Sequence, residues 1–536
     1  MNLKKQIASV LACSMLLAAV PAEAMAYETP DTVRVGLESI CKNASAATIK
    51  EEKLYVGMEY EGEFEEGGVI KSQSGTFTVK PATGEFIMLE SEMYLDEAID
   101  LAKSLTNMGY DAYAAFLMDE EWTVYVKGAS RADVEEAARE NVSTKVGFEG
   151  FSLSGGEVKF LLSEGDLLMG YNGDDTFKLN TNTYRGMLTF AVTGTTMTAV
   201  NVIGLEEYLY GVVPSEMPKS YEKEALKAQA VAARTYAMTK LGAHTGSGYQ
   251  LCDGTNCQVY KGFSGEAATT TDAVDATAGE VACYNGTPIE AVFSASTGGY
   301  TESSENVWWA AVPYLRAVPE IAEYGDNTWT KELTLDELSD LLETKDAGIG
   351  KAKDIVITKL STGGRVQEMQ IVGTNGTKTL TKENIRTYFS GACGSLPGKM
   401  FTINGKGGEI GQYGSTQEKA ETEVTTKGGG LLAAVATKGI IAKTDGALSH
   451  LNGKKILVDV EVEKSAEKTK DVSDHGVYEV YNVNISTVKN DKFLFEGVGF
   501  GHGVGLSQKG AQAMAQLGYD YEEILYHYYT GITIED

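Results

Sequence analysis

The segment Gly211-Val212-Val213-Pro214-Ser215-Glu216-Met217-Pro218 lies near the middle of the chain and precedes an alanine-rich helical stretch. Proline fixes its own φ and biases the preceding residue toward extended conformations, so Pro214 and Pro218 leave this segment few ways to move. A carboxyl group held rigidly beside a partly dry surface can have its pKa raised toward neutrality, as a general acid requires. A lone glutamate is more often an exposed loop residue, but the motifs described below favour catalysis. The segment therefore predicts that Glu216 is a catalytic acid.

Helical patterns flank this segment on both sides. Residues 205–210 predict a short helix, and Ser220 is the expected N-cap of the next helix, with Glu222 and Glu224 in its first turns. Gln229 and Arg234 are the polar interruptions of this second helix. Its other positions carry small residues that allow a close approach by another element: Ala225, Ala228, Ala230, Ala232 and Ala233.

Glycine recurs at every second position from Gly497 to Gly505. If this strip is extended, one face has no side chains and the other carries Val498, Phe500, His502 and Val504, so that a ligand or another backbone can come very close. Ser507 is the expected N-cap of a helix over 508–516. The spacing matches neither phosphate-binding glycine motif, which argues against a nucleotide site. A histidine is usually a packing residue, but His502 has little to pack against among glycines.

Two further clusters contain residue types suited to ligand or metal binding. Residues 294–301 combine hydroxyls with a double glycine, and Glu305 and Trp308-Trp309 follow, which suits an open sugar groove or else a serine-rich turn without a ligand. His244 precedes Cys252 and Cys257, which lie five residues apart. These three residues could be zinc ligands, or the two cysteines could form a small disulfide loop outside the cell.

Length and charge limit the classes of protein. The 536 residues are enough for two to four domains. Residues 1–26 begin with lysines, continue with an apolar run and end in small-x-small sites, which is typical of an export signal. The net charge of −29 argues against nucleic acid and anionic lipid as partners. Five cysteines remain beyond the signal, an odd and scattered set that is not a disulfide framework.

The N-terminal part predicts a split βαβ layout. Residues 95–109 and 132–140 have helical patterns, whereas 111–116 and 122–126 alternate as strands. This layout resembles the SPOR repeat, which binds peptidoglycan glycan strands. The resemblance implies a glycan-binding sheet that presents Tyr113, Trp122 and Tyr125.

Residues 404–492 form a predicted insertion. Its part 415–427 is rich in threonine, glutamate and lysine and is followed by three glycines, which fits a flexible linker. Residues 456–462 and 477–483 alternate as strands. We expect a small β-rich flap here.

Together the segments resemble the SpoIID/LytB family, the sporulation stage II protein D type of peptidoglycan lytic transglycosylase. The resemblance covers about 184–403 and 495–536 and rests on residues 205–218, 228–236, 257–260, 294–308 and 499–508. In that family the glutamate of the Pro-Ser-Glu-Met motif is the catalytic acid, which implies this role for Glu216. The resemblance also implies substrate contacts by Ser215, Gln258, Tyr260, Ser294, Ser296, Gly298, Gly299, Thr301, Glu305, Trp308, His502, Ser507 and Gln508.

The resemblance is less complete at the predicted metal site. Members that hold zinc tend to have histidine just before the cysteine of the Cys-Gln-Val-Tyr motif, where this chain has Asn256. His244, Cys252 and Cys257 therefore remain the candidate ligands of a site that is one ligand short.

The sequence thus predicts a mixed α+β, multi-domain, secreted cell-wall protein. The expected parts are a signal peptide (1–26), a SPOR-like peptidoglycan-binding region (27–150), a SpoIID catalytic domain in two parts (151–403 and 493–536) and the insertion between them (404–492). The expected activity is cleavage of MurNAc-GlcNAc glycan strands to 1,6-anhydroMurNAc ends, with no required cofactor. The alternative is a non-catalytic peptidoglycan-binding modulator of a cell-wall amidase. A cysteine hydrolase that uses Cys257 and His502 lacks any recognisable nucleophile motif.

Overall fold

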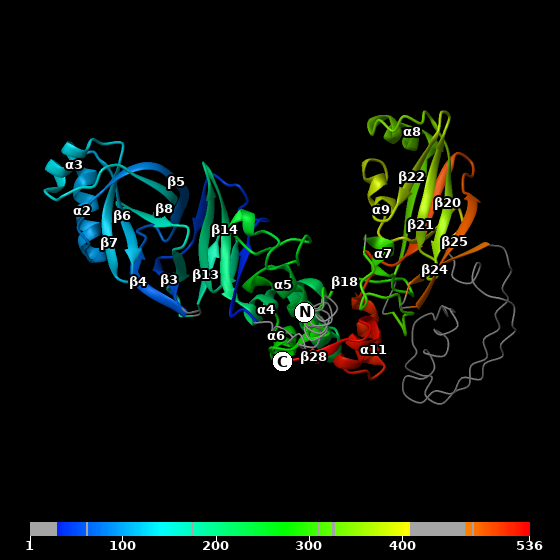
Figure 1. Cartoon of the computed structure of the whole chain (residues 1–536). Coiled ribbons are helices and arrows are strands. Elements are labelled where there is room, and N and C mark those ends of the chain that lie inside the picture. Colours follow the sequence, from blue (N-terminus) through cyan, green and yellow to red (C-terminus); the bar gives the residue numbers. More distant parts are fainter. Residues whose placement is uncertain are drawn as a thin grey trace, which may run out of the picture.

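The computed structural model describes residues 29–60, 63–173, 175–308, 310–323, 327–407, 467–473 and 476–536, with side chains beyond 407 described from residue 482. It is a mixed α+β, multi-domain structure, as predicted (Figure 1). The predicted signal peptide lies outside the described residues. Within the described part of the chain, no helix is long and apolar enough to cross a membrane.

A seven-stranded sheet joins the start of the described chain to the segment before Glu216. Its strands follow the order β15 (Leu251–Cys252), β1 (Thr32–Gly36), β14 (Thr196–Gly204), β13 (Met187–Thr193), β10 (Leu167–Gly170), β3 (Lys53–Tyr60) and β4 (Glu63–Lys71). The central strand β14 is buried on both faces from residue 197 to residue 203. Strands from both sides of residue 150 therefore share one sheet, and the domain boundary at this position stays a prediction.

The predicted split βαβ layout is present in the second sheet. β5 (Phe77–Met88), α2 (Leu95–Asn107), β6 (Asp111–Met118), β7 (Glu121–Lys127), α3 (Arg131–Ala138) and β8 (Val146–Ser154) give the spatial strand order β8-β5-β7-β6. β9 (Lys159–Ser163) pairs with both β6 and β8, so five strands close into a ring. β2 (Ala47–Ile49), β11 (Thr176–Leu179) and β12 (Asn182–Arg185) extend this sheet beyond β5.

Closure of the ring determines how accessible the predicted glycan-binding residues are. Tyr113 and Tyr125 lie opposite each other on β6 and β7 and join a small apolar cluster to which all five strands contribute. Because α2 packs on the other face of β6 and β7, this cluster lies inside the ring. Trp122 is fully buried on the helix-covered face and donates its indole N–H to the Gly67 carbonyl. The predicted contact of Trp122 with glycan is therefore wrong, and the resemblance to SPOR stays a prediction.

The helices around Glu216 differ from the prediction at two ends. α4 (Leu205–Glu216) is longer than expected because it continues through Pro214. Proline removes one helical hydrogen bond, but it lies in the last turn, and Met217 before Pro218 is extended, as a residue that precedes proline prefers. α5 (Lys223–Lys240) has Glu222 as its N-cap instead of Ser220. It contacts α4, α6 (Ala268–Asp275), α11 (Gln508–Gln516) and α12 (Tyr521–Tyr528).

A second unit with its own apolar core follows Glu323 in the sequence and is drawn on the right of Figure 1. One of its sheets has the order β19 (Thr328–Thr334), β26 (Lys492–Val498) and β23 (Met400–Ile403). The other has the order β22 (Thr377–Thr381), β21 (Val366–Gly373), β20 (Ala352–Ser361), β25 (Gly476–Ser486) and β24 (Glu467–Ser473).

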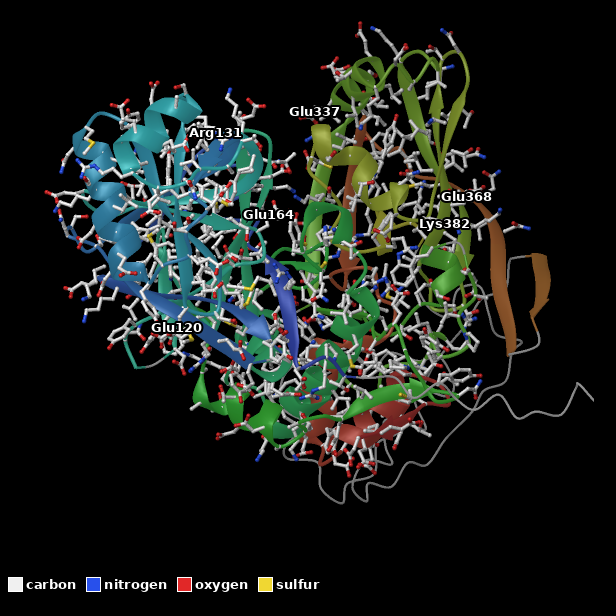
Figure 2. All side chains as sticks on the ribbon, turned by 60° about the vertical axis from the view of Figure 1, so that its left-hand side comes forward. Glu120, Arg131, Glu164, Glu337, Glu368 and Lys382 are labelled. Atoms are coloured by element: carbon white, nitrogen blue, oxygen red, sulfur yellow. The ribbon has the colours of Figure 1, made fainter. Side chains whose placement is uncertain are left out.

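α8 (Leu335–Thr344) begins with a capping box in which Thr334 and Glu337 satisfy each other's backbone N–H groups; Glu337 is labelled in Figure 2. The predicted strand at 477–483 lies within β25. The predicted linker at 415–427 and the predicted strand at 456–462 lie outside the described residues. The boundaries at 403 and 492 stay predictions.

Candidate active site

Glu216 is the last residue of α4, and its half-buried carboxylate has two donors. The backbone N–H of Val259 donates to Oε1 at 2.9 Å, and Nε2 of Gln508 lies 3.5 Å from Oε2. Burial raises the pKa of Glu216 above the usual glutamate range, and these two hydrogen bonds oppose the shift. A carboxyl group with a raised pKa and two donors for its ionised form can give up a proton and take it back.

Gln508 connects Glu216 to the core. Its Nε2 also donates to Oε1 of Gln229, at 3.3 Å, from the first turn of α11 to the middle of α5. Both amides are buried, and Nε2 of Gln229 has no hydrogen-bond partner among the described residues. Gln508 was predicted as a substrate contact; in the structure its side chain is buried and donates to the Glu216 carboxylate.

Three other predicted substrate contacts have structural partners. Ser215 Oγ donates to the Gly211 carbonyl at 2.7 Å within α4. Gln258 is buried and donates to the Ala233 carbonyl at 2.9 Å, whereas the hydroxyl of buried Tyr260 donates to Asn201 at 2.8 Å. Gln258 and Tyr260 therefore fix the loop that presents the Val259 N–H and have almost no surface for a ligand.

The glycine strip is not extended beyond Val498, so that part of the prediction is wrong. Gly499, Gly501, Gly503 and Gly505 all have positive φ, between 70° and 107°. The expected close approach is present, however. A Cβ at Gly499 would lie 2.8 Å from the Thr297 backbone, and one at Gly503 would lie 2.2 Å from the Arg365 guanidinium. Glycine is needed here for both its dihedral angle and its lack of a side chain.

The glycine strip (497–505) lies against the serine-rich segment (294–301). Ser294 and Ser507 are paired where β18 (Phe293–Ser294) runs parallel to β27 (Leu506–Ser507), and Ser296 exchanges backbone hydrogen bonds with Phe500. Ser507 is the N-cap of α11, as predicted, and accepts from the Gly510 N–H at 3.1 Å.

The predicted substrate donors of this segment are engaged within the chain. Ser296 Oγ, the Gly298 N–H and Ser507 Oγ all donate to Glu323, at 3.0–3.2 Å. The other predicted contacts of this segment are also accounted for, since the Thr301 hydroxyl bonds to the Val318 backbone and Gly299 accepts from the Glu320 N–H. Ser294 Oγ is buried and has no partner among the described residues.

Glu320 lies beside Glu323 and is buried. Its carboxyl group accepts hydrogen bonds from the Tyr528 hydroxyl, at 2.6 Å, and from Thr297 Oγ1. Burial and the neighbouring Glu323 raise the pKa of Glu320 to about 8, while these hydroxyls oppose the shift. Glu320 is therefore protonated at neutral pH and acts as a neutral hydrogen-bonding group between α12 and the 294–301 segment.

We expect the raised pKa of Glu320 to make the protein less stable as pH rises from about 5 to about 8. An unfolded glutamate has a pKa near 4.3, so the folded protein holds the extra proton in this range, and the free energy of unfolding falls by up to about 1.4 kcal/mol per pH unit. Glu320→Gln cannot ionise and should flatten this dependence. Denaturant titrations of both proteins at pH 5.5, 6.5, 7.5 and 8.5 measure it, and equal slopes would contradict the assignment.

His502 is a packing residue. Its ring lies 5.3 Å from that of Trp308, and Nδ1 accepts from the Val504 N–H at 3.0 Å. Burial, with the nearby cations Arg386, Arg365 and Lys399, lowers the pKa of His502 to about 4, so the ring is neutral. The expectation that His502 has little to pack against among glycines is wrong.

Glu305, another predicted contact, forms a bidentate ion pair with Arg316 at 2.9 and 2.7 Å. Lys382, labelled in Figure 2, reaches from the second unit to the carbonyls of Glu305 and Trp308. These contacts join the second unit to the segment that contains Glu305.

The three candidate metal ligands lie together. One ligand atom from each of His244, Cys252 and Cys257 falls within 4.8 Å of the others, and both thiols are free. Two sulfurs and an imidazole nitrogen are a ligand set that zinc prefers, and Asn256 lies 3.4 Å from the histidine nitrogen. The loop from Cys252 leads directly to Val259, whose N–H contacts Glu216.

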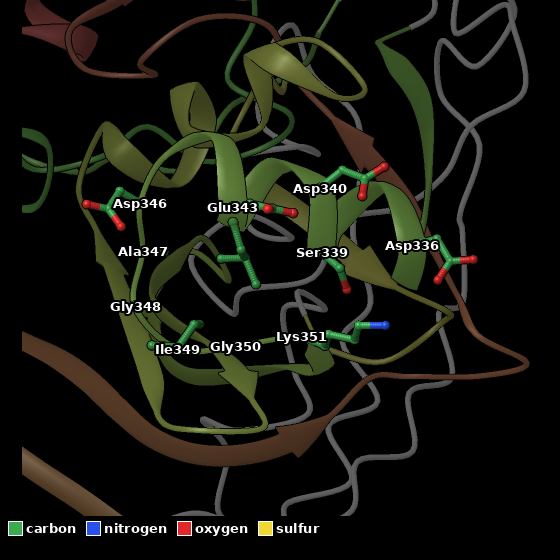
Figure 3. Close-up of a pocket in the computed structure, with 11 residues that line it drawn as sticks. Asp336, Ser339, Asp340, Glu343, Asp346, Ala347, Gly348, Ile349, Gly350 and Lys351 are labelled. Atoms are coloured by element: carbon green, nitrogen blue, oxygen red, sulfur yellow. The ribbon is translucent and has the colours of Figure 1, made fainter.

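A separate cavity of about 380 Å³ lies in the second unit, on α8 (Figure 3). Asp336, Asp340, Glu343 and Asp346 line it with Lys351. None of its lining residues is among those that contact Glu216, so it is not part of this site.

Sequence reasoning missed Glu320, Glu323 and the partner role of Gln508. The two glutamates lie three residues apart in Pro319-Glu320-Ile321-Ala322-Glu323. Two glutamates outside any motif give no sign of burial, so no signal in the sequence identifies these residues.

Comparisons with known proteins match the part of the chain that contains Glu216. The family model for the stage II sporulation protein, SpoIID, matches residues 193–284, which contain Glu216 and the candidate metal ligands, and a model for a domain of unknown function, DUF8618, matches 305–431. The chain is 33% identical over 330 residues to the amidase enhancer of Bacillus subtilis (strain 168), covering 61% of this chain and 40% of that protein.

Two further relatives are covered over most of their length. An uncharacterised protein of Brachyspira hyodysenteriae, BHWA1_00569, is 30% identical over 368 residues, which are 68% of this chain and 76% of that protein. The stage II sporulation protein D of Bacillus subtilis is 28% identical over 353 residues, which are 63% of this chain and 76% of that protein. The chain also has the Pro-Ser-Glu-Met segment at the end of α4, with the partners Val259 and Gln508. From these matches, the chain belongs to the SpoIID family.

Proposed function

We propose that the protein is an exported peptidoglycan lytic transglycosylase that acts outside the cytoplasm. The observation that carries the proposal is Glu216, a half-buried carboxyl group with a raised pKa and two donors for its ionised form. The neutral acid protonates the glycosidic oxygen between N-acetylmuramic acid and N-acetylglucosamine. The resulting carboxylate then takes the proton of the substrate's own C6 hydroxyl as that oxygen attacks C1.

This mechanism needs no second enzymic carboxylate, because the nucleophile belongs to the substrate. The described residues fit this requirement. Two other glutamates, Glu323 and Glu320, are connected to Glu216 through α11. Glu323 accepts from hydroxyl and backbone donors, and Glu320 is held neutral. Glu216 alone can therefore first donate the proton and then accept one.

Mass spectrometry of the products from purified peptidoglycan tests the proposal. A lytic transglycosylase releases fragments that end in 1,6-anhydro-muramic acid, whereas a hydrolase releases reducing ends. Absence of both kinds of fragment would contradict an enzymic role.

A second candidate function is supported by the relative named amidase enhancer, of which the chain covers 40%. The protein would then bind peptidoglycan and raise the activity of a separate cell-wall amidase. Stimulation of an amidase by both wild-type protein and Glu216→Gln, without anhydro ends, would favour this function. The predicted SPOR-like region 27–150 would contribute glycan binding in either case.

We also propose that His244, Cys252 and Cys257 hold one zinc ion with a structural role. Zinc would hold the 252–259 loop and so the Val259 N–H beside Glu216. Protein purified with zinc is expected to carry about one equivalent per chain by elemental analysis. Cys252→Ser and Cys257→Ser should lose it and melt at lower temperature, whereas Cys283→Ser, a buried cysteine outside the cluster, should retain it. Metal-free wild-type protein would contradict this assignment.

A further inference from the structure

Glu323 has an unusually complete set of hydrogen-bond donors for a half-buried carboxylate. Oε1 accepts from the Thr297 N–H at 2.7 Å, from Ser296 Oγ at 3.1 Å and from Ser507 Oγ at 3.2 Å. The Gly298 N–H lies 3.0 Å from Oε2, which also accepts from Asn327 Nδ2 at 3.0 Å. These donors are neutral, so an ionised carboxylate makes stronger hydrogen bonds with them than a neutral side chain would.

The donors come from three separate parts of the chain. Thr297 and its neighbours belong to the serine-rich segment, Ser507 is the N-cap of α11, and Asn327 directly precedes β19. The Lys509 N–H also donates to the Ala295 carbonyl at 3.0 Å, so the start of α11 lies against the serine-rich segment. Glu323 therefore joins this segment to the N-terminus of α11.

The same end of α11 contacts Glu216. Gln508 follows Ser507 directly, and its Nε2 lies 3.5 Å from Glu216 Oε2 and 3.3 Å from Gln229 Oε1. A shift of the α11 N-terminus would carry Gln508 away from Glu216, because Gln508 is the first residue of that helix. The path from Glu323 to Glu216 thus consists of one hydrogen bond, one peptide unit and one side-chain contact.

We propose that Glu323 is a positioning residue for Glu216: its carboxylate fixes the start of α11 so that Gln508 stays on the Glu216 carboxylate. The proposal deepens the proposed function and rests on it for its kinetic readout. It differs from a purely structural role, which would lower stability without changing how Glu216 titrates.

Glu323→Gln in the full-length protein is the principal test. The amide places an NH₂ group among donors, so it cannot accept from all of them, and the start of α11 should shift. We expect kcat to fall by up to about 10²-fold with little change in KM. The pH at which activity is lost on the alkaline side should move upward, because Glu216 loses the donor that favours its ionised form. Glu290→Gln changes a partly exposed glutamate paired with Lys240; this variant is the control and should behave as wild type.

A double-mutant cycle separates positioning from general damage. Gln508→Ala removes the donor directly and should produce the same upward shift, and Glu323→Gln combined with Gln508→Ala should shift it no further. Additive shifts would overturn the proposal. If Glu323→Gln does not fold, Glu323→Asp keeps the charge but is one methylene shorter, and it should shift the profile in the same direction by a smaller amount. An unshifted profile in Glu323→Asp would overturn the proposal as well.

A titration that does not depend on turnover distinguishes failure of this proposal from failure of the proposed function. The Glu216 carboxyl is followed by infrared difference spectroscopy between each protein and its Glu216→Gln counterpart. An upward-shifted midpoint in Glu323→Gln supports the positioning role even if wild-type protein releases no anhydro product. An unchanged midpoint overturns it even if the wild-type protein is an active lytic transglycosylase.

Discussion

Glu216→Gln is expected to lower the release of anhydro-muropeptides by at least about 10²–10⁴-fold, the usual contribution of a general acid–base group. Glutamine has nearly the same shape and can still accept from the Val259 N–H and lie beside Gln508. It cannot donate a proton to the glycosidic oxygen or take one from the C6 hydroxyl, so both halves of the proposed reaction fail. Glycan binding should survive, because a neutral amide replaces an acid that is itself protonated when it acts.

The measurement is product release from purified peptidoglycan by mass spectrometry, together with a sedimentation assay for binding. Glu207→Gln is the matched control, since it changes another glutamate of α4 at the opposite end of the helix. It should keep wild-type turnover. A Glu216→Gln protein that releases anhydro ends at the wild-type rate would remove Glu216 from the mechanism.

Arg234→Ala is expected to cost up to about 3–5 kcal/mol of folding free energy, the range for breaking a buried ion pair from one side, with the partial exposure of Glu206 reducing the loss. The fully buried Arg234 forms a bidentate pair with Glu206, with Nε at 2.7 Å and Nη2 at 2.5 Å, and its Nη1 donates to the Glu280 carbonyl at 3.0 Å. Alanine leaves a cavity and removes the donors from Glu206 and from the carbonyl. Because the ion pair joins α5 to α4, the loss of stability is expected to affect α4, the helix that carries Glu216.

Denaturant unfolding followed by circular dichroism measures this loss. Lys223→Ala, an exposed cation at the first position of the same helix, should change stability by less than about 0.5 kcal/mol. A loss below about 1 kcal/mol for Arg234→Ala would mean that the pair contributes no more than a surface ion pair.

Local pattern was sufficient for much of the N-terminal fold. α2, β6, β7 and α3 lie within a few residues of their predicted ranges, because each has a clear period of apolar residues. The closure of the ring by β9 was not predictable, since it depends on a parallel pairing with β6 that no local pattern specifies. The burial of Trp122 was not predictable either, because it depends on the packing of α2 on that face of β6 and β7.

Helix ends were less predictable than helix interiors. Ser507 was correctly predicted as a cap, since its hydroxyl accepts from the Gly510 N–H in the structure. Ser220 was not a cap, although the residue type is equally suitable, because α5 begins two residues later. The helix predicted over 205–210 continues to Glu216, because the one hydrogen bond that Pro214 removes in the last turn is tolerated when the helix is packed on α5 and α6.

The candidate acid and the candidate metal ligands could be identified from the sequence, whereas the contacts among the residues around them could not. Glu216 was identified as a candidate acid from its motif, a role that stays a prediction, and His244, Cys252 and Cys257 do lie together. Ser296, Gly298 and Ser507 were predicted as substrate contacts, but in the structure all three contact Glu323, which carries no motif. Polar residues that bind a substrate and polar residues that bind a buried carboxylate have the same composition, and only the fold distinguishes them.

The separation of Glu216 from Gln508 by 292 positions has a consequence for the order in which the molecule matures. During synthesis α4 and the loop that contains Val259 emerge early, but α11 emerges only after the whole second unit. Until then the acid lacks one of its two partners, and Glu323 lacks Ser507. A nascent chain therefore has an incomplete candidate site, and the contacts of Glu216 and Glu323 with α11 form only when the last helices have packed on the rest of the protein.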